Sequence, residues 1–291
     1  MNTKLALGLI VVGIFILIVL IGPLMEPYPP SAVSGPPLVS PTISYPMGTD
    51  HLGRDVFSRI LAGSGGIITT AFLGILLGTF LGVILGFVGF FGGFLDEILM
   101  GFVDLLLSFP VLLTGLLVVS ALGNESVWLI LGTGFIFMPR TAKVVRASVL
   151  NEKTEEYITA AKAIGASDTR IVFKHILPNV FYIVIVEVTT RFAQGLLLVS
   201  ALSFLGLGTP LDSPDWGRMI SDGRDYLLVA PWIVLFPAGA ISLLVIAVNL
   251  VADGLQETST NRYWSKANNF HTGKIAYLKR IVGNNRKGPD T

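Results

Sequence analysis

The chain has 291 residues, of which 52% are hydrophobic and only 13% are charged, and its mean hydropathy is +0.74. These values lie outside the range of ordinary soluble domains and indicate an integral membrane protein. A net charge of +1 provides no concentrated basic face, so nucleic acid is excluded as an expected partner. With no cysteine and three scattered histidines, the sequence predicts neither a disulfide framework nor a metal site.

Six apolar runs are each long enough, at about 20 residues, to cross a bilayer core of roughly 30 Å as helices. They cover approximately residues 5–24, 66–91, 98–122, 127–150, 180–206 and 230–252. No small-residue cleavage site follows the first run, so we expect an uncleaved span there rather than a signal peptide. The sequence therefore predicts an all-α integral membrane protein with six transmembrane helices embedded in lipid.

The polar segments divide the chain and set its orientation. We expect an N-terminal transmembrane helix at 1–24, a proline-rich extracytoplasmic loop at 25–65, a five-helix core at 66–252 and a tail at 253–291. With the N-terminus inside, fifteen Lys and Arg residues fall on the inner side and four on the outer side. We therefore expect a multi-pass protein of the cell membrane. Both termini and the segment 151–179 are expected on its cytoplasmic side.

Four glycines recur at a strict four-residue spacing in the second run: Gly74, Gly78, Gly82 and Gly86. Small residues at this spacing allow two helices to approach closely in lipid. We expect them to pack within one helix bundle, and a contact with another subunit is the alternative.

The segment 151–179 is amphipathic although it lies between two apolar runs. Its first part starts after Thr154 and places Tyr157, Ala160, Ala161 and Ile164 on one helix face. Gly165 is suited to end that helix, and a second helix is expected from about Asp168 to Pro178. A face lined by alanines suits docking into a groove of a partner protein, whereas a helix resting on lipid headgroups is the alternative.

This segment resembles the EAA loop of ABC-importer membrane subunits, in which E-A-A is followed by three residues, a glycine and later L-P. The stretch "TAAKAIG" supplies Ala160, Ala161 and Gly165, and "HILPN" supplies the L-P pair. Thr159 stands where the family has glutamate, and Glu155 or Glu156 can supply the acid from one turn earlier.

Five further stretches resemble the type-C permease subunits of the dipeptide, oligopeptide and nickel importers. They are "MGTDHLGRDVFSRILAG", "GFFGGFLDEILMGFVDLLLSFP", "ALSFLGLGTP", "PDWGRMISDGRDYL" and "APWIVLFPAGAISLLVIAVNLVADGL". They occur in the family's order and cover most of residues 46–256, whereas the tail after Leu255 departs from the family's short acidic ending.

The resemblance implies a type I ABC importer with a MetI-like core. Such an importer has a second homologous permease subunit, two cytoplasmic ATPase subunits and an extracytoplasmic solute-binding protein. The segment 151–179 would hold the coupling helix. The residues that would meet an ATPase subunit are Glu155, Glu156, Tyr157, Thr159, Ala160, Ala161, Lys162, Gly165, Ala166, Asp168 and Arg170.

The chain contains no GxxxxGK[ST] phosphate-binding loop. We therefore expect a transport subunit that is not an enzyme and binds no cofactor, with ATP and Mg²⁺ held by the partner ATPase subunits. Peptides are the expected cargo, and oligosaccharide or nickel is the alternative within the family. An ion-coupled secondary transporter is disfavoured because only six spans and no inverted repeat are evident.

Ionisable groups inside or beside the spans have two readings each. Glu187, Arg191 and Gln194 share one face of the fifth run and are expected either to line the translocation pathway or to form a structural pair. Asp50, Arg54, Asp55 and Arg59 are expected to form salt bridges on the surface of a short helix, and direct contact with the substrate is the alternative. Trp216 is expected to be exposed on the outer side, as an interfacial anchor or a binding-protein contact.

Overall fold

The computed structural model describes residues 3–123, 125–210 and 212–284, with only the backbone described for 259–284. In this part the chain is helical and forms no β-strand, which confirms the predicted all-α fold. The elements are α1 (Thr3–Ile21), η1 (Gly22–Leu24), α2 (Val56–Phe91), α3 (Gly93–Leu107), α4 (Val111–Leu122), α5 (Ser126–Lys153), α6 (Glu156–Ala163), α7 (Asp168–Ile171), η2 (Val172–Ile176), α8 (Leu177–Phe204), α9 (Trp216–Gly223), η3 (Arg224–Tyr226) and α10 (Trp232–Asn284).

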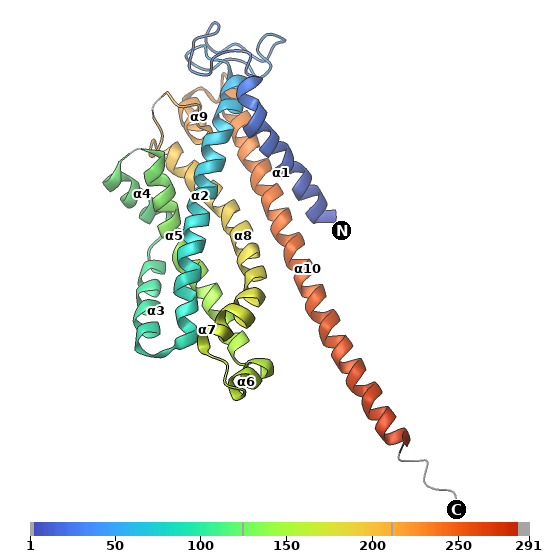
Figure 1. Cartoon of the computed structure of the whole chain (residues 1–291). Coiled ribbons are helices and arrows are strands. Elements are labelled where there is room, and N and C mark those ends of the chain that lie inside the picture. The colour runs from blue at the N-terminus through green and yellow to red at the C-terminus, as the bar shows by residue number, and fades with distance from the viewer. Residues whose placement is uncertain (1–2, 124, 211, 285–291) are drawn as a thin grey trace, which may run out of the picture.

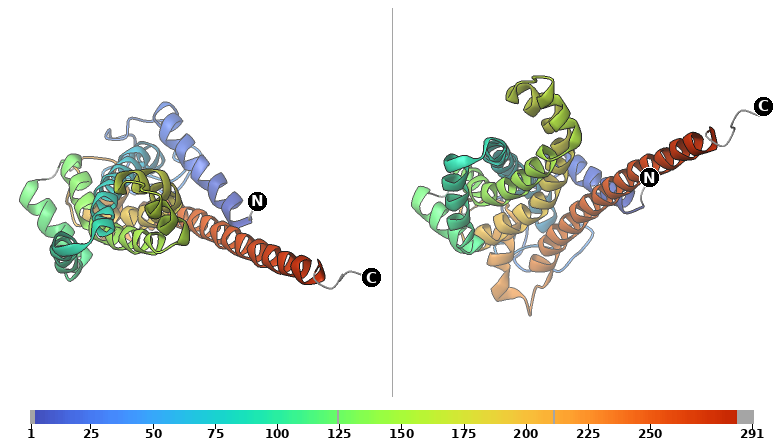
Figure 2. Two further views of the ribbon diagram at one scale, coloured as in Figure 1. Left: turned by 60° about the horizontal axis from the view of Figure 1, so that its bottom comes forward. Right: turned by 90° about the horizontal axis from the view of Figure 1, so that it is seen from below.

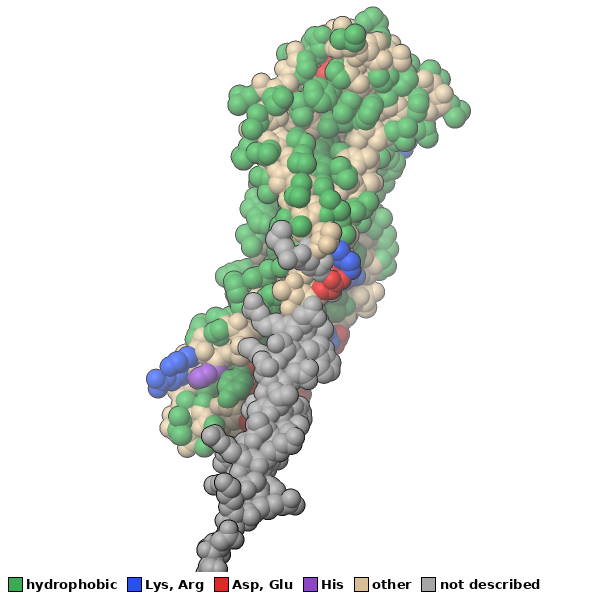
Figure 3. Space-filling model, turned by 90° about the vertical axis from the view of Figure 1, so that its right-hand side faces the viewer, with side chains coloured by type: hydrophobic (Ala, Val, Ile, Leu, Met, Phe, Trp, Pro, Cys, Tyr) green, Lys and Arg blue, Asp and Glu red, His purple; other side chains and the backbone are tan. Residues whose placement is uncertain are grey.

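The long helices form one bundle, with the 25–55 loop and α9 at one end and α6 at the other (Figure 1). Helix α10 packs along α1 and leaves the bundle on the side opposite α3 and α4, as both views in Figure 2 show. Hydrophobic side chains cover the flank of the bundle in Figure 3, and charged side chains gather toward the end that holds α6. This distribution is the one expected of a helix bundle that faces lipid along its length.

Four helical segments of the described chain are long and apolar enough to span a membrane: Thr3–Leu24, Val56–Phe91, Asp168–Phe204 and Trp232–Thr258. Helices α3 and α4 qualify together as a fifth span that is bent by 93°. Helix α5 is long enough, but Arg140, Lys143 and Arg146 lower its hydropathy. Because much of α5 is buried against other helices, it does not need an apolar surface. The count of six spans stays a prediction.

Helix α5 packs along α2 through the four regularly spaced glycines. A Cβ atom on Gly78 would lie 2.6 Å from the carbonyl oxygen of Gly134, and one on Gly82 would lie 2.8 Å from that of Met138. Backbones this close leave no room for a side chain, so the expected packing within one bundle is confirmed.

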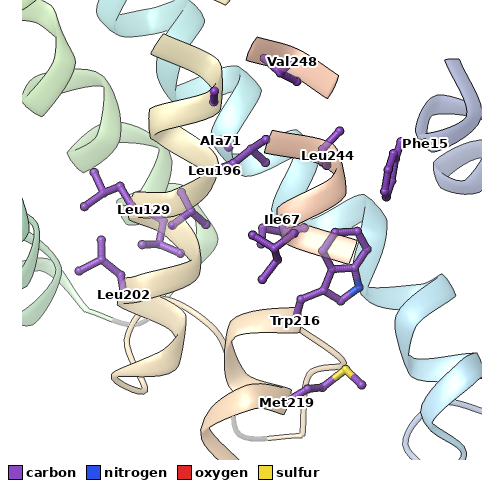
Figure 4. Close-up of a cluster of buried hydrophobic side chains, with 14 of the residues drawn as sticks. Phe15, Ile67, Ala71, Leu129, Leu196, Leu202, Trp216, Met219, Leu244 and Val248 are labelled. Carbon is purple, nitrogen blue, oxygen red and sulfur yellow. The ribbon is translucent and has the colours of Figure 1, made fainter. Parts of the chain in front are cut away.

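Trp216 lies in the core at the end of the bundle that holds α9 and the 25–55 loop, so the expectation of an exposed aromatic anchor is wrong. Its side chain is 1% exposed, and its Nε1 donates a hydrogen bond to the Ile60 carbonyl oxygen at 3.0 Å. Figure 4 shows the indole beside Ile67 and facing Phe15 of α1, whose ring it meets edge-on at 6.1 Å. Gly217, whose Cβ would lie 2.3 Å from the Ser200 carbonyl oxygen, brings α9 close enough to α8 to bury it.

The acidic and basic residues around the start of α2 are buried, so the expected surface salt bridges are wrong as well. Arg54 Nε lies 2.6 Å from Asp50 Oδ2. Arg59 is 1% exposed and donates to the carbonyl oxygens of Pro30 and Ser213, each at 3.1 Å. Arg59 thereby joins the 25–55 loop to the loop before α9, because its guanidinium has several donors directed at different acceptors.

Helix α2 begins at Val56 and not near residue 66, because the side chain of Asp55 accepts a hydrogen bond from the Ser58 N–H and caps it. Residues 56–65 of the expected loop 25–65 are therefore helical.

Candidate functional site

The end of the bundle opposite α9 contains the expected helix, glycine turn and helix. Helix α6 ends at Ala163, Gly165 has φ +84°, and the Ser167 side chain accepts a hydrogen bond from the Arg170 N–H at the start of α7. A positive φ is accessible to glycine without the steric cost that other residues meet. The predicted turn is confirmed. The expected end of the second helix at Pro178 is wrong, because α7 continues through the π-helical turn η2 into α8.

One face of α6 packs against the bundle, and it is not the face that the sequence indicated. Ile158 and Ala161 are buried in an inner cluster whose members are Phe90, Val145, Val149, Ile158, Ala161, Ile171, Val172, Ile176 and Val180. Ala161 was expected on the partner-facing side and packs inward instead. Ile158, which the helical pattern did not single out, is the apolar anchor that turns the helix this way.

The opposite face of α6 is open to solvent in this chain. Tyr157 is 40% exposed, Ile164 is 87% exposed and Ala160 is also exposed, which leaves an apolar strip three and four residues apart. Around it, the charged and polar candidates Glu155, Glu156, Thr159, Lys162, Gly165, Asp168 and Arg170 are exposed, and Ala166 is partly buried. Phe173 of η2 is 65% exposed and adds an apolar group that the sequence reasoning missed.

Hydrogen bonds fix α6 to its two flanking helices. The Tyr157 hydroxyl donates to Glu152 at the end of α5 and accepts from Asn179 Nδ2 at 2.8 Å, at the start of α8. Burial, together with the neighbouring Glu152 carboxylate, raises the pKa of Tyr157 to about 12. The hydroxyl therefore stays protonated and keeps donating at physiological pH.

Phe90, the penultimate residue of α2, connects the inner cluster to this segment. Lys153 Nζ donates to the Phe90 carbonyl oxygen at 2.7 Å and lies 5.3 Å from the centre of its ring. Lys162 Nζ of α6 lies 5.6 Å from the same ring centre. Cations at such distances are attracted by the negative face of an aromatic ring.

The three polar candidates of the fifth run lie together on α8. Arg191 Nε lies 2.6 Å from Glu187 Oε1, and Arg191 Nη1 donates to Gln194 Oε1 at 2.8 Å. The side chains of Glu187 and Arg191 are 9% and 15% exposed. The predicted pairing of these two residues is confirmed, and their lining of a pathway stays a prediction.

No group of three or more His, Cys, Asp or Glu side chains in the described part of the chain could hold a metal ion.

Comparison with known proteins gives one family. Residues 74–264 match the family described as the binding-protein-dependent transport system inner membrane component. The chain is 36% identical over 264 residues to the dipeptide transport system permease protein DppC of Alkalihalophilus pseudofirmus, covering 88% of this chain and 85% of the relative. For the protein of the same name from Haemophilus influenzae the identity is 34%, covering 88% and 90%. The glutathione transport system permease protein GsiD of Escherichia coli is 37% identical over 221 residues, covering 75% and 72%.

Proposed function

The chain belongs to the family of binding-protein-dependent transport system inner membrane components, and from this premise we propose that it is a permease subunit of an ATP-driven importer of peptides. The similarity to dipeptide and glutathione permeases supports peptides of a few residues as the cargo. The solute-binding protein would deliver the peptide to the outer end, where the 25–55 loop and α9 lie. A second, homologous permease subunit would complete the pathway.

The observation that carries the proposal is the two-sided character of α6. One side is anchored in the bundle through Ile158 and Ala161, and the other exposes Tyr157, Ala160 and Ile164. A short amphipathic helix that is fixed on one side and apolar on the other is suited to insert into a groove of a partner. We assign this partner as one of two cytoplasmic ATPase subunits, which would hold the ATP and Mg²⁺.

In the proposed mechanism, closure of the ATPase dimer pushes α6, and the bundle changes between inward-open and outward-open arrangements. The nucleotide acts on one end of the molecule and the loaded binding protein on the other, so both bias the same two-state equilibrium. This mechanism requires α6 and both termini to face the cytoplasm, in agreement with the distribution of Lys and Arg.

The test uses neighbouring cysteines, because the chain has no native cysteine. Ala160→Cys lies on the exposed side of α6 and Ala161→Cys on the buried side. The two cysteines are neighbours in sequence, but their side chains lie on different sides of the helix. In the assembled complex, with a cysteine in the α6-binding groove of the ATPase subunit, Ala160→Cys is expected to crosslink in a nucleotide-dependent manner. Ala161→Cys is expected to remain uncrosslinked.

Equal crosslinking of both variants, or of neither in a complex shown to be intact, would overturn the assignment of α6. The cargo is tested separately in proteoliposomes that contain the whole transporter. ATP-dependent uptake of a dipeptide or of glutathione, and no uptake of an oligosaccharide or nickel, is the expected result.

A further inference from the structure

Three cations follow one another along α5 at a spacing of three residues: Arg140, Lys143 and Arg146. Two of them are paired with carboxylates of α3. Lys143 Nζ lies 2.6 Å from Asp104 Oδ1, and Arg146 makes two hydrogen bonds to Asp96, at 2.8 and 2.7 Å. Arg140 has no ion pair or hydrogen bond from its side chain to any residue of the described chain. Of the three cations, Arg140 is therefore the one that has no carboxylate partner in the described chain.

The position of Arg140 makes an unpaired charge costly. It lies 14 residues after the first residue of α5, at a depth of roughly 20 Å at 1.5 Å per residue. A bilayer core is roughly 30 Å thick, so this depth is inside it. Ionisable residues at such a depth face water, another charge or a polar partner.

The backbone beside Arg140 is also irregular. Helices α3 and α4 meet at an angle of 93° around Ser108, Phe109 and Pro110, and all three residues are exposed. Non-helical backbone at membrane depth is tolerated only where protein covers it or where it lines a water-filled cavity. Because this chain does not cover the elbow at 108–110, lipid is an unsuitable neighbour for it.

Arg140 and the elbow border the same crevice. Its lining includes Leu107, Phe109 and Thr114 from the bent pair, and Phe135, Pro139 and Arg140 from α5. Pro139 lies inside α5 and has no N–H, so the carbonyl oxygen of Phe135 lacks the donor that a regular helix would give it. The crevice thus places a guanidinium group beside a helical turn that lacks one of its regular hydrogen bonds.

We propose that this elbow face is the wall that the chain contributes to the aqueous translocation pathway, and that Arg140 binds the carboxylate of the transported peptide there. The inference rests on the proposed function. A guanidinium group recognises a carboxylate through two parallel hydrogen bonds. The crevice has a volume of about 20 Å³, so only a small terminal group enters it and the rest of the peptide lies beyond the elbow.

The first measurement tests whether the elbow at 108–110 is exposed to water. Ser108→Cys and Thr114→Cys are introduced into the otherwise cysteine-free chain, and the whole transporter in lipid nanodiscs is treated with a membrane-impermeant anionic methanethiosulfonate. Ile246→Cys on α10 is the control, because Ile246 is 57% exposed in this chain and lies in a candidate span. Labelling of Ser108→Cys with no labelling of Ile246→Cys is expected. An unlabelled elbow in both nucleotide-free and ATP-bound complexes would overturn the proposal.

The second measurement asks what Arg140 binds. A dipeptide with a free carboxylate should slow labelling of Ser108→Cys, whereas the same dipeptide amidated at its C-terminus should protect about tenfold less. Adding Arg140→Gln should abolish the difference between the two peptides, and Arg140→Lys should retain part of it. The control Lys143→Gln removes the same charge from a residue that already has a partner, and it should keep the difference.

Labelling that neither peptide slows would overturn the carboxylate assignment and would assign Arg140 to a fixed acidic group of the second permease subunit. Protection that is equal for the acid and the amide would also overturn it. The uptake assay keeps the two proposals apart: a transporter that carries no peptide contradicts the proposed function, while the labelling still reports whether the elbow is aqueous.

Discussion

Lys162 of α6 holds its ammonium group over the ring of Phe90, the buried residue near the end of α2, with 5.6 Å between the nitrogen and the ring centre. Lys153 of α5 approaches the same ring at 5.3 Å and also binds the Phe90 carbonyl oxygen. A single side chain of α2 thus contacts both the proposed coupling helix and the helix that precedes it. Because α2 packs along α5 through closely spaced glycines, we expect a displacement of α6 to move both long helices together.

Replacement of Phe90 should therefore weaken the link between ATP hydrolysis and transport. Phe90→Leu keeps an apolar side chain in the inner cluster but removes the aromatic face, so the two lysines lose a contact of about 0.5–2 kcal/mol each. We expect the assembled transporter to hydrolyse ATP at a rate that depends less on the loaded binding protein, and to move less peptide per ATP. Both quantities are measured in proteoliposomes.

The control is Phe91→Leu. Phe91 is the next residue of α2 and is 66% exposed, so it contributes little to the inner cluster. A loss of coupling that is the same for Phe90→Leu and Phe91→Leu would contradict the role given to Phe90.

Trp216 should be a major source of stability at the end of the bundle that holds α9. Trp216→Ala removes a fully buried indole and is expected to lower the free energy of unfolding by about 3–5 kcal/mol. Trp216→Phe keeps most of the packing and loses the hydrogen bond to Ile60, which costs about 1 kcal/mol. The unfolding temperatures of the detergent-solubilised proteins are expected to fall in the order wild type, Trp216→Phe, Trp216→Ala. Equal stability of wild type and Trp216→Ala would show that the loop before α9 is not held by this side chain.

Asp215 should make stability depend on pH. It is buried, and burial raises the pKa of its carboxyl group above the usual 3.8. The protonated form is therefore favoured by folding, and its stabilising contribution is complete below pH 3.8 and is lost as the pH rises through the raised pKa. Asp215→Asn has no such titration, so its stability relative to wild type should increase as the pH is raised from the acid range to neutrality.

The same residue caps α9, since its side chain accepts from the Arg218 N–H at 3.1 Å. Asparagine can also cap, whereas Asp215→Ala loses the cap and should be less stable than Asp215→Asn by about 1 kcal/mol at every pH. Unfolding temperatures are compared for the three proteins at acid and neutral pH. If the difference in unfolding temperature between wild type and Asp215→Asn is the same at both pH values, the predicted titration of Asp215 is wrong.

Sequence patterns predicted the parts of this fold that depend on local chemistry. The lengths of the apolar runs predicted the four long apolar helices and the bent pair of α3 and α4, and the spacing of Gly74, Gly78, Gly82 and Gly86 indicated close helix packing within the bundle. The patterns did not predict which side chains are buried by segments that are distant in the sequence. Arg59 binds carbonyl oxygens at residues 30 and 213, and Trp216 binds one at residue 60. Such partners are far away in sequence, so both side chains were expected at the surface.

The same reason explains the error within the candidate site. An eight-residue helix such as α6 is too short for periodicity to choose between two apolar faces, and both are present in it. One contains Ile158 and Ala161, and the other contains Tyr157, Ala160 and Ile164. Which face packs inward is decided by the inner cluster, whose other members come from α2, α5, α7 and α8 and from η2.

Substitution of two glycines on α2 should have opposite effects. A Cβ atom on Gly78 would lie 2.6 Å from the Gly134 carbonyl oxygen, and because this oxygen is backbone, α2 and α5 would have to separate. Gly78→Ala should therefore destabilise the protein by about 1–3 kcal/mol. Gly66 is helical as well, but a Cβ atom there would meet nothing within 4 Å. Gly66→Ala should stabilise by about 0.5–1 kcal/mol, because alanine loses less conformational freedom in a helix. Thermal unfolding of both variants in one detergent gives the comparison, and shifts of the same sign would show that the close approach at Gly78 does not hold the two helices together.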